Sequence, residues 1–375
     1  MRKLRVGILF GGRSGEHEVS LMSALSVVNA IDREKFDITL IGITKEGRWV
    51  VAEDPVRALA SGTVEEGVPV LLSHDPSRSQ EVQLIPVEPA GYLSRQLSQP
   101  LDVVFPVLHG PYGEDGTVQG LLDLAGIPYV GAGVMASAVG MDKEFMKIAF
   151  AHRGLPIVRY AVFPRSRWDR EPEAVMEEVE SSFDYPVFVK PANLGSSVGI
   201  SKVRNREELR AGLQEAAAYD RKVLVEEGLE DIHEVECSVL GNEEPEASEV
   251  GEIVPCNEFY DYRAKYIDDR SELIIPARLP EGVRNEVKEL ALEAFRAIDC
   301  AGMARVDFFV TRGDHEIYVN EINTIPGFTR ISMYPKLWEA SGLSYSDLIT
   351  RLIELALERH RDRLRSRISY TPRDS

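Results

Sequence analysis

The sequence predicts a mixed α/β protein in which an open α/β domain precedes further sheet-forming segments. Three observations support this prediction. A strand, a glycine-rich turn, a helix and a second strand follow one another between residues 4 and 43. A loop rich in glycine and serine follows an apolar strand that ends at Lys190. Residues 303–323 alternate apolar and polar side chains on both sides of a short turn, as a β-hairpin does.

Composition restricts what this protein can bind. The chain has 375 residues, enough for two or three domains, and carries a formal net charge of −18. Nucleic-acid binders and anionic-membrane binders present a basic face, so neither partner is expected. An anionic ligand would therefore need local cations or backbone N–H groups.

Cysteine usage and hydropathy predict a cytoplasmic protein. Cys237, Cys256 and Cys300 show no metal-type spacing and suit reduced thiols. No apolar run reaches the roughly 18 residues that span a bilayer. The first residues also lack the apolar region of a signal peptide.

The first domain is expected to span residues 1–140. The pattern predicts a strand over Leu4–Phe10, a turn over Gly11–Gly15, a helix over Glu18–Ile31 and a strand over Phe36–Ile43. In open α/β domains, ligands bind at the carboxyl edge of the sheet, where this glycine turn is placed. The turn lacks the G-x-G-x-x-G pattern, so no dinucleotide is inferred.

The expected ligand edge of this domain contains two candidate segments. Glu16 immediately precedes the first helix, where the helix dipole alone also favours a carboxylate. Residues 53–100 are irregular in pattern. After the predicted strand Leu101–Leu108, three glycines in His109–Thr117 indicate a ligand loop and not a plain turn. A helix and a short strand are predicted next, over Val118–Ala125 and Ile127–Val130.

The central part, residues 141–230, combines lysines with a loop of phosphate-binding composition. Lys143 opens a predicted helix, where an exposed lysine would be ordinary. The apolar strand Tyr185–Lys190 leads into Gly195–Gly199, where glycine N–H groups and serine hydroxyls can cradle an anion. The loop lacks the Walker pattern, and a flexible hairpin is the alternative. A strand with an acidic end, Val223–Leu229, closes this part.

The third part, residues 231–365, is expected to carry the hairpin. The predicted strand His233–Leu240 precedes a long loop, Asn257–Arg270. Its three tyrosines suggest a lid that excludes water from a site. Helices are predicted over Glu281–Ile298 and from Tyr345 to about Leu357, with fraying from Arg359 and a tail over 366–375.

The hairpin is expected to place four polar side chains on one face. If it is symmetric about Asp314, then Asp307 faces Glu321 and Arg305 faces Asn323. Like charges directly opposite each other destabilise a sheet, and a divalent cation would remove that conflict. Two carboxylates and an amide oxygen are hard ligands of the kind that Mg²⁺ takes. The alternative is a solvated face on which Arg305 and Asp307 pair.

Taken together, these segments resemble a known enzyme family. The chain is similar to the ATP-grasp ligases, and among them to the D-alanine–D-alanine ligases, from the first strand to about Leu364. Each motif is weak alone, whereas all of them in the same order are specific. The matching segments are Gly11–Ser20, Leu108–Thr117, Met141–Lys143, Val189–Gly199, Tyr260–Tyr266, Ala304–Asp307 and Asn320–Gly327. The resemblance implies an ATP-grasp fold after an N-terminal open α/β, Rossmann-like domain.

The resemblance also implies where ATP and metal ions bind. Of the ATP-binding residues, the two lysines would bind phosphates, Glu226 would face the adenine and Glu234 the ribose. The metal ligands would hold two Mg²⁺ ions, for which Mn²⁺ can substitute, and an activating monovalent cation is left open. The implied ATP-binding residues are Lys143, Lys190, Ser196, Ser197, Glu226, Glu227, Leu229 and Glu234, and the implied metal ligands are Asp307, Glu321 and Asn323.

A first D-alanine is implied at the glycine-rich edge of the first domain. By the resemblance, Glu16 would bind its ammonium group and form a network with Ser196 and Tyr266. His109 would line the same site. The Gly195–Gly199 loop would close over the phosphates.

A second D-alanine is implied beside the hairpin. Lys265 and Ser332 would receive its carboxylate, while Arg305 and the Gly327 N–H group would stabilise charge on the reacting carboxyl group. In this family a tyrosine at the position of Tyr266 accompanies D-alanine as acceptor, in contrast to D-lactate or D-serine.

The implied activity is ATP-dependent synthesis of D-alanyl-D-alanine through an acyl phosphate, for peptidoglycan precursors, by a homodimer built on the first domain. One alternative is another carboxylate–amine ligase of the same fold, for an L-amino acid or for D-lactate or D-serine. A second alternative is a nucleotide-binding regulator without catalysis. The complete set of Arg305, Asp307, Glu321 and Asn323 argues against that regulator, because simple nucleotide binding does not need it.

Overall fold

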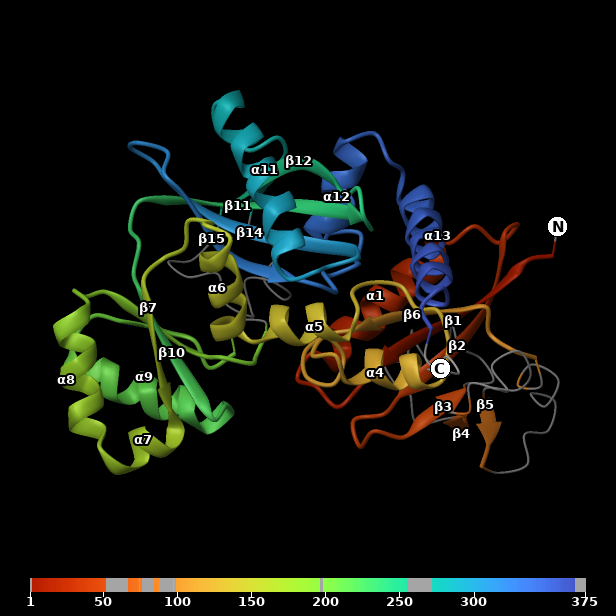
Figure 1. The fold of residues 1–375 in the computed structure, drawn as a ribbon, viewed down its shortest axis with the longest axis horizontal. Coiled ribbons are helices and arrows are strands. Elements are labelled where there is room, and N and C mark those ends of the chain that lie inside the picture. Colours follow the sequence, from red (N-terminus) through yellow and green to blue (C-terminus); the bar gives the residue numbers. More distant parts are fainter. Residues whose placement is uncertain are drawn as a thin grey trace, which may run out of the picture.

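The computed structural model describes residues 2–51, 67–73, 75, 84–87, 97, 99–195, 198–254 and 272–367. In these ranges the strands form three sheets, which follow one another along the chain. Figure 1 shows the four-stranded sheet at one end of the molecule, the six-stranded sheet at the other end and the five-stranded sheet above the space between them. No helix in the described ranges is long and apolar enough to cross a membrane.

The six-stranded sheet begins with the predicted strand, turn and helix. Its strands lie in the order β5-β4-β3-β2-β1-β6, and β1 pairs in parallel with both β2 and β6. The later strands β3, β4 and β5 extend the sheet in antiparallel fashion. The bounds are β1 Leu4–Gly11, α1 His17–Ala30, β2 Phe36–Ile43, β3 Trp49–Val51, β4 Val68–Leu72, β5 Leu84–Pro86 and β6 Val103–Leu108.

Two sequence expectations for this domain are wrong. Residues 53–100 are not irregular throughout, because β4 and β5 lie within them; strands of three to five residues are too short for a clear alternation. The predicted strand Ile127–Val130 is reduced to a single bridge between Tyr129 and Val104. Pro128 in its middle has no N–H group to donate to a sheet.

Three helices connect the first sheet to the second. They are α4 (Thr117–Leu124), α5 (Val134–Met141) and α6 (Lys143–His152). The side chain of Asp142 caps α6 by accepting hydrogen bonds from the N–H groups of Glu144 and Phe145. The buried face of α6 carries Lys143, Met146, Lys147 and Phe150 at helical spacing, so two lysines point into the interior.

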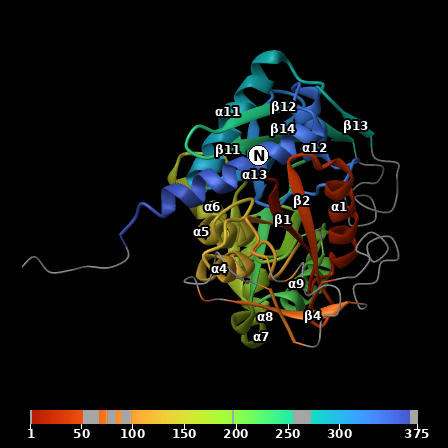
Figure 2. The same cartoon turned by 90° about the vertical axis from the view of Figure 1, so that its right-hand side faces the viewer.

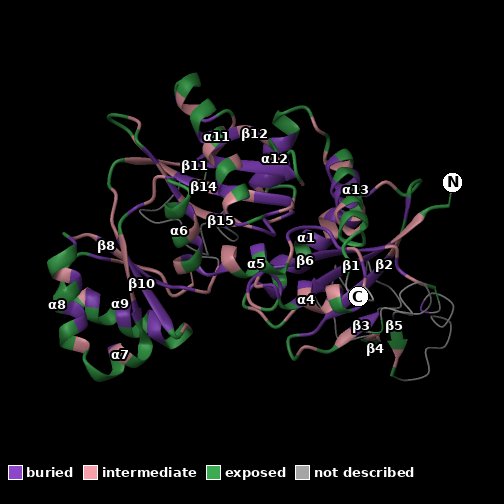
Figure 3. Cartoon of the chain, viewed as in Figure 1, coloured by how far each residue is buried: buried purple, intermediate pink, exposed green. Residues whose placement is uncertain are grey.

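The four-stranded sheet is antiparallel, in the order β7-β10-β8-β9. Apolar residues of its three helices pack on one face, in a core that includes Phe163, Trp168 and Val175. Figure 3 shows the outward sides of these helices exposed and the strands buried. The bounds are β7 Tyr160–Pro164, α7 Arg165–Arg170, α8 Pro172–Ser182, β8 Val187–Pro191, β9 Ser201–Val203, α9 Arg206–Tyr219 and β10 Lys222–Glu227.

The five-stranded sheet contains the predicted hairpin at its edge. It is antiparallel, in the order β13-β12-β11-β14-β15. The apolar side chains of α11 share a core with β11, β14 and β15. The bounds are β11 Ile232–Gly241, β12 Glu246–Val254, β13 Glu272–Ile274, α11 Glu281–Ala297, β14 Gly302–Thr311, β15 Ile317–Asn323 and α12 Met333–Ala340.

The predicted register of the hairpin is confirmed where the polar residues lie. Arg305 pairs with Asn323 and Asp307 with Glu321. Towards the turn the register shifts by one residue, because a bulge makes Phe308 the partner of Val319. Strict alternation would place Val319, two residues before Glu321, on the polar face, but the bulge turns it into the core, where it is fully buried.

The last helix, α13 (Tyr345–Arg363), joins the third part to the first. Its apolar residues share one core with β1, β6 and α1, and Figure 2 shows it lying between the five-stranded sheet and the first sheet. The predicted end near Leu357 and the fraying from Arg359 are wrong. The Arg359 guanidinium donates to the carbonyls of Tyr129 and Gly131 and lies 4.5 Å above the Tyr129 ring, which anchors the final turns.

Candidate active site

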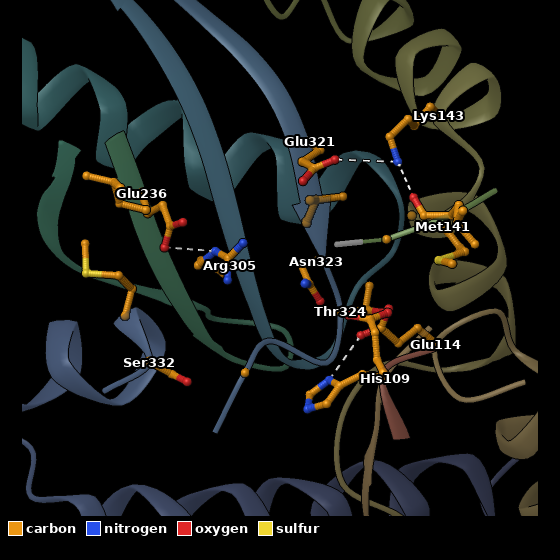
Figure 4. Close-up of a pocket in the computed structure, with 18 of the residues that line it drawn as sticks. His109, Glu114, Met141, Lys143, Glu236, Arg305, Glu321, Asn323, Thr324 and Ser332 are labelled. Carbon is orange, nitrogen blue, oxygen red and sulfur yellow. Dashed lines mark hydrogen bonds and ion pairs between the residues drawn. The ribbon is translucent and has the colours of Figure 1, made fainter. Parts of the chain in front are cut away.

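A polar cavity lies where the first domain, α6 and the hairpin meet. Figure 4 shows its lining side chains pointing towards one another from these separate elements. The sequence-predicted residues that line it are Glu16, His109, Lys143, Arg305, Glu321, Asn323, Gly327 and Ser332. Side chains from distant parts of the chain thus converge on one space, as at a ligand site.

Glu16 is held at the glycine-rich edge of the first sheet. It is buried, and it directly precedes α1. Gly110 has a φ of 76°, and a Cβ there would lie 2.8 Å from the Glu16 carboxylate. A Cβ on Gly195 would lie 3.1 Å from the same carboxylate. Both glycine-rich loops therefore approach Glu16, which places the start of the Gly195–Gly199 loop at the Glu16 end of the cavity.

His109 shares this end of the cavity with two carboxylates. Its Nε2 lies 3.2 Å from Ser23 Oγ, and its Nδ1 lies 3.5 Å from Glu114 Oε1. Burial opposes protonation of the imidazole, but the hydrogen bond and charge of Glu114 and the charge of Glu16 outweigh it and raise the pKa of His109. The raised pKa favours the cationic imidazole, which can pair with a carboxylate group of a ligand.

Arg305 sits between two carboxylates on the hairpin face. It donates two hydrogen bonds of 2.7 Å to Asp307, and its Nε lies 3.0 Å from Glu236. Burial would lower the pKa of Arg305, but Asp307 and Glu236 raise it well above its ordinary value. Arg305 is therefore a fixed positive charge that faces the cavity.

Lys143 connects the hairpin to the glycine-rich loop. Its Nζ lies 3.6 Å from Glu321 Oε2 and donates a hydrogen bond of 2.8 Å to the Leu194 carbonyl. Lys143 thus lies between a predicted metal ligand and the residue before Gly195. Lys143 therefore offers a positive charge to an anion that enters the cavity between the hairpin and the glycine-rich loop.

The predicted metal ligands have suitable chemistry. Asp307 and Glu321 face each other across the hairpin, and Asn323 follows Glu321 on the same face. Asn323 Oδ1 accepts one hydrogen bond from the Ile325 N–H group, which leaves its second lone pair for a ligand. No group of three or more His, Cys, Asp and Glu side chains in the described ranges is arranged to hold a metal ion. The predicted set differs in kind, since it contains only two such residues and an amide.

Lys190 and Glu226 lie outside this cavity lining, in a second cluster on the four-stranded sheet. Glu226 Oε1 lies 2.7 Å from Lys147 Nζ, and Glu226 Oε2 contacts Lys190 Nζ. Burial would raise the pKa of Glu226, but the two lysines lower it to about 2. The Glu226 carboxylate is therefore charged and held by two cations.

The other predicted nucleotide residues are placed as follows. Glu227 is half-buried and forms a bidentate pair with Arg159 at 2.9 Å. Leu229 follows β10, and Glu234 lies near the start of β11. Four predicted site residues, Ser196, Ser197, Lys265 and Tyr266, and the predicted lid Asn257–Arg270 lie outside the described residues.

Sequence patterns missed three residues of these clusters. Lys147 lies one helical turn after Lys143, and this spacing alone places both lysines on one face of the helix. Glu236 is the cross-strand partner of Asp307, which only the pairing of β11 with β14 reveals. Glu114 was placed on the predicted ligand loop without a role, and it contacts His109.

Family models match both halves of the chain. The model described as D-ala D-ala ligase N-terminus matches residues 5–132, and that described as D-ala D-ala ligase C-terminus matches residues 149–354. The D-alanine–D-alanine ligase of Natranaerobius thermophilus is 52% identical over 372 residues, which cover 99% of this chain and 100% of the relative. That of Acetivibrio thermocellus is 51% identical over 376 residues and covers 97% and 98%.

Solved structures show the same relation. The D-alanine–D-alanine ligase of Coxiella burnetii superimposes with a TM-score of 0.83 at 36% identity, over 97% of both chains. The VanG D-Ala:D-Ser ligase of Enterococcus faecalis superimposes with a TM-score of 0.83 at 37% identity, over 95% of this chain and 100% of the other. The relatives match nearly the whole chain, and the two family models match both of its halves. This protein therefore belongs to the D-alanine–D-alanine ligase family, with the ATP-grasp fold.

Proposed function

We propose that this protein joins two D-alanine molecules at the expense of ATP, to supply D-alanyl-D-alanine for peptidoglycan precursors. The observation that carries the proposal is the single cavity in which Glu16, Lys143 and Arg305 meet the hairpin oxygens. A ligase of this kind needs an ammonium site, a phosphate site and a cation near the reacting carboxyl group. The family match supplies the chemical identity of the substrates.

At the nucleotide side, Lys143 and Lys190 bind phosphate groups, and Gly195–Gly199 closes over them. Asp307, Glu321 and Asn323 would hold two Mg²⁺ or Mn²⁺ ions, which would offset the charge that develops on the phosphoryl oxygens. We further expect that a monovalent cation can activate the enzyme, which rates in potassium and in sodium salts would test. The adenine and ribose lie against the segment from Glu226 to Glu234.

The proposed reaction has two steps. A carboxylate oxygen of the first D-alanine attacks the terminal phosphorus of ATP, and ADP leaves. The amine of the second D-alanine then attacks the acyl carbon, the tetrahedral intermediate loses inorganic phosphate, and the amine proton passes to solvent. Phosphorylation is needed because a carboxylate oxygen is a poor leaving group.

The chain's own residues orient and stabilise these steps. Glu16 holds the first ammonium group beside His109, while Lys265 and Ser332 hold the second carboxylate. Arg305 and the Gly327 N–H group stabilise the oxygen that gains charge in the tetrahedral intermediate. Closure of the loop Asn257–Arg270, with Tyr266 near Glu16 and Ser196, would exclude water from the acyl phosphate.

The similarity to a D-Ala:D-Ser ligase raises a second candidate acceptor. The VanG structure superimposes as well as the Coxiella ligase does, so the fold alone does not choose between acceptors. The pairing of Lys265 with Tyr266 supports D-alanine. D-serine in place of the second D-alanine therefore serves as the competing substrate in the assay.

Assembly and location complete the proposal. We propose a cytoplasmic homodimer built on the first domain, with domains over residues 1–140, 141–230 and 231–365 and a tail over 366–375. Light scattering of the purified protein would give its mass. A monomer at assay concentration would contradict the dimer without affecting the proposed reaction.

The test of function is phosphate release from ATP with Mg²⁺, with products identified by mass spectrometry. The amino acids are D-alanine, L-alanine, and D-alanine with D-lactate or D-serine. Release with D-alanine alone and formation of its dipeptide are expected. Phosphate release only with L-alanine, or only with a second acceptor, would support a ligase activity and contradict D-alanine as both substrates. Binding of ATP without turnover of any amino acid would favour a regulator.

A further inference from the structure

We propose that Lys147 is a positioning residue for ATP binding: it keeps Glu226 paired while Lys190 turns to a phosphate group. This inference rests on the phosphate-binding role proposed for Lys190 and assigns a part to a lysine that the two-step reaction does not use. The three side chains form what is called here the lysine–glutamate cluster, composed of Lys147, Glu226 and Lys190.

The geometry shows two cations sharing one carboxylate. Lys147 Nζ lies 2.7 Å from one Glu226 oxygen, and Lys190 Nζ contacts the other. The side chains of Lys147 and Glu226 are 1% and 3% exposed, so solvent cannot replace either partner. The cluster contains two positive charges and one negative charge. This local excess of one positive charge suits an anionic ligand.

Three separate elements build the cluster. Glu226 lies on β10 and faces the cross-strand neighbour Phe188 of β8, two residues before Lys190. Lys190 and Glu226 are therefore diagonal neighbours on one face of the four-stranded sheet. Lys147 comes from α6, where it lies one turn after Lys143 on the buried face. The helix α6 thus places Lys143 at the cavity and Lys147 in the lysine–glutamate cluster.

Burial explains why two lysines are needed. Removal of one partner from a buried ion pair is strongly unfavourable, because an uncompensated charge remains in the interior. If Glu226 had only Lys190 as a partner, every movement of Lys190 towards a phosphate would leave such a charge. With Lys147 in place, Glu226 keeps one cation and stays ionised. Desolvation lowers the pKa of Lys147, and the charge of Glu226 opposes that shift, so the two groups depend on each other.

The first experiment compares ATP with adenosine, by isothermal titration of the full chain in Mg²⁺ without D-alanine. Adenosine lacks the phosphates that Lys190 would bind. The variant Lys147→Met removes the charge at nearly constant volume and should weaken ATP about tenfold, while adenosine stays within about twofold. Unchanged ATP binding would overturn the proposal, and so would equal weakening of both ligands, which would mark Lys147 as merely structural.

The second experiment asks whether removing the other charge restores binding. In Lys147→Met with Glu226→Gln, no buried charge depends on Lys190. The ratio of ATP to adenosine affinity should return to that of Glu226→Gln alone, which serves as the reference for any adenine contact of Glu226. A double variant that binds ATP as weakly as Lys147→Met contradicts the proposal. If Lys147→Met alone does not fold, the double variant is compared with Glu226→Gln alone. A lower ATP-to-adenosine ratio in the double variant then contradicts the proposal.

Two further variants control for charge and stability. Lys147→Arg keeps the cation and should bind ATP nearly as the original chain does. Val175→Ala shortens a fully buried side chain in the core on the other face of the same sheet, away from the cluster. It should lower the unfolding temperature and leave the ATP-to-adenosine ratio unchanged. A change of that ratio in Val175→Ala would overturn the assignment of the effect to Lys147.

One variant separates this inference from the proposed function. Lys190→Met should weaken ATP at least as strongly as Lys147→Met, again without an effect on adenosine. If Lys190→Met leaves ATP binding intact, the phosphate-binding role itself fails. If Lys190→Met weakens ATP and Lys147→Met does not, only the positioning role of Lys147 fails.

Discussion

The two ion clusters of this protein have the same plan with opposite signs. On the four-stranded sheet, one carboxylate, Glu226, lies between Lys147 and Lys190. On the hairpin, one cation, Arg305, lies between Asp307 and Glu236. In each cluster one outer group, Lys190 or Asp307, is a predicted ligand-binding residue, and the other, Lys147 or Glu236, was not predicted from the sequence.

The difference lies in what the central group does. Arg305 lines the cavity, whereas Glu226 is buried on the four-stranded sheet. The hairpin cluster therefore presents its central group to the cavity, whereas all three side chains of the lysine–glutamate cluster are buried. In both, the second outer group would keep the central charge paired when the first turns to a phosphate or a metal ion.

The largest expected effect is on the hairpin centre. Arg305→Met should lower kcat by on the order of 10²–10³, as loss of an oxyanion-hole donor does, because the developing negative charge loses its counter-ion. Steady-state rates of phosphate release would measure this. Arg305→Lys keeps the charge without the bidentate contact to Asp307, and it should recover part of the rate. A loss of kcat below about tenfold in Arg305→Met would contradict the difference drawn between Arg305 and Glu226, because Arg305 would then be only a structural partner of Asp307.

A smaller effect is expected from the unassigned carboxylate. Glu236→Gln leaves Arg305 with Asp307 as its main charged partner, so Asp307 should bind a metal ion less well, by roughly tenfold. Mn²⁺ titration followed by electron paramagnetic resonance, without ATP or D-alanine, would report this directly. Glu252→Gln, a buried carboxylate on the neighbouring strand β12, is the matched control. Equal Mn²⁺ affinity in the two variants would show that Glu236 does not act on the metal site.

The hairpin was largely predictable from sequence because its information is local. Alternation and a turn fixed the facing pairs of Arg305 with Asn323 and of Asp307 with Glu321. The bulge beside Asn320 was not predictable, since an extra residue in one strand leaves no mark in a pattern of period two. It moved both Val319 and Ile317, which strict alternation places on the face of Glu321, into the core, where both are buried.

The lysine–glutamate cluster was less predictable because its contacts are long-range. Lys147 and Glu226 lie on α6 and β10, and nothing near either residue in the sequence indicates that they meet. The predicted end of α13 was wrong for the same reason. Arg359 is held by the carbonyl of Tyr129, which is distant in the sequence. Family resemblance supplied the roles of Lys190 and Glu226, and it supplied no role for Lys147.

Acid stability compares Glu226 with Glu252, a carboxylate that also has two partners but no part in the proposed site. Glu252 pairs with His233 at 2.7 Å and with Arg278. Burial opposes ionisation of both carboxylates, but their partners lower each pKa to about 2 from an ordinary 4.5. A lowered pKa gives stability that is complete above about pH 4.5 and is lost as the pH falls towards 2.

Denaturant unfolding between pH 7 and pH 3 would test this contribution. Glu252→Gln should lower the free energy of unfolding at pH 7 and flatten its decline in acid, because one titrating group is removed. Glu226→Gln should do the same and also change ATP binding, which Glu252→Gln should leave intact. An unaltered acid slope in Glu252→Gln would contradict the lowered pKa.

The smallest effect is expected one residue away from Glu226. Glu227 points to the opposite face of β10, as successive residues of a strand do, and pairs with Arg159 at the surface. The Arg159 side chain is 63% exposed, so water and salt screen the pair and replace it readily when it is broken. Arg159→Gln should therefore leave both the unfolding temperature and the ATP affinity unchanged in calorimetry and titration. Weaker ATP binding in this variant would show that Glu227 reaches the nucleotide through its side chain. The contrast on β10 between the buried Glu226, which affects ATP binding, and the exposed pair of Glu227 with Arg159, which does not, would then fail.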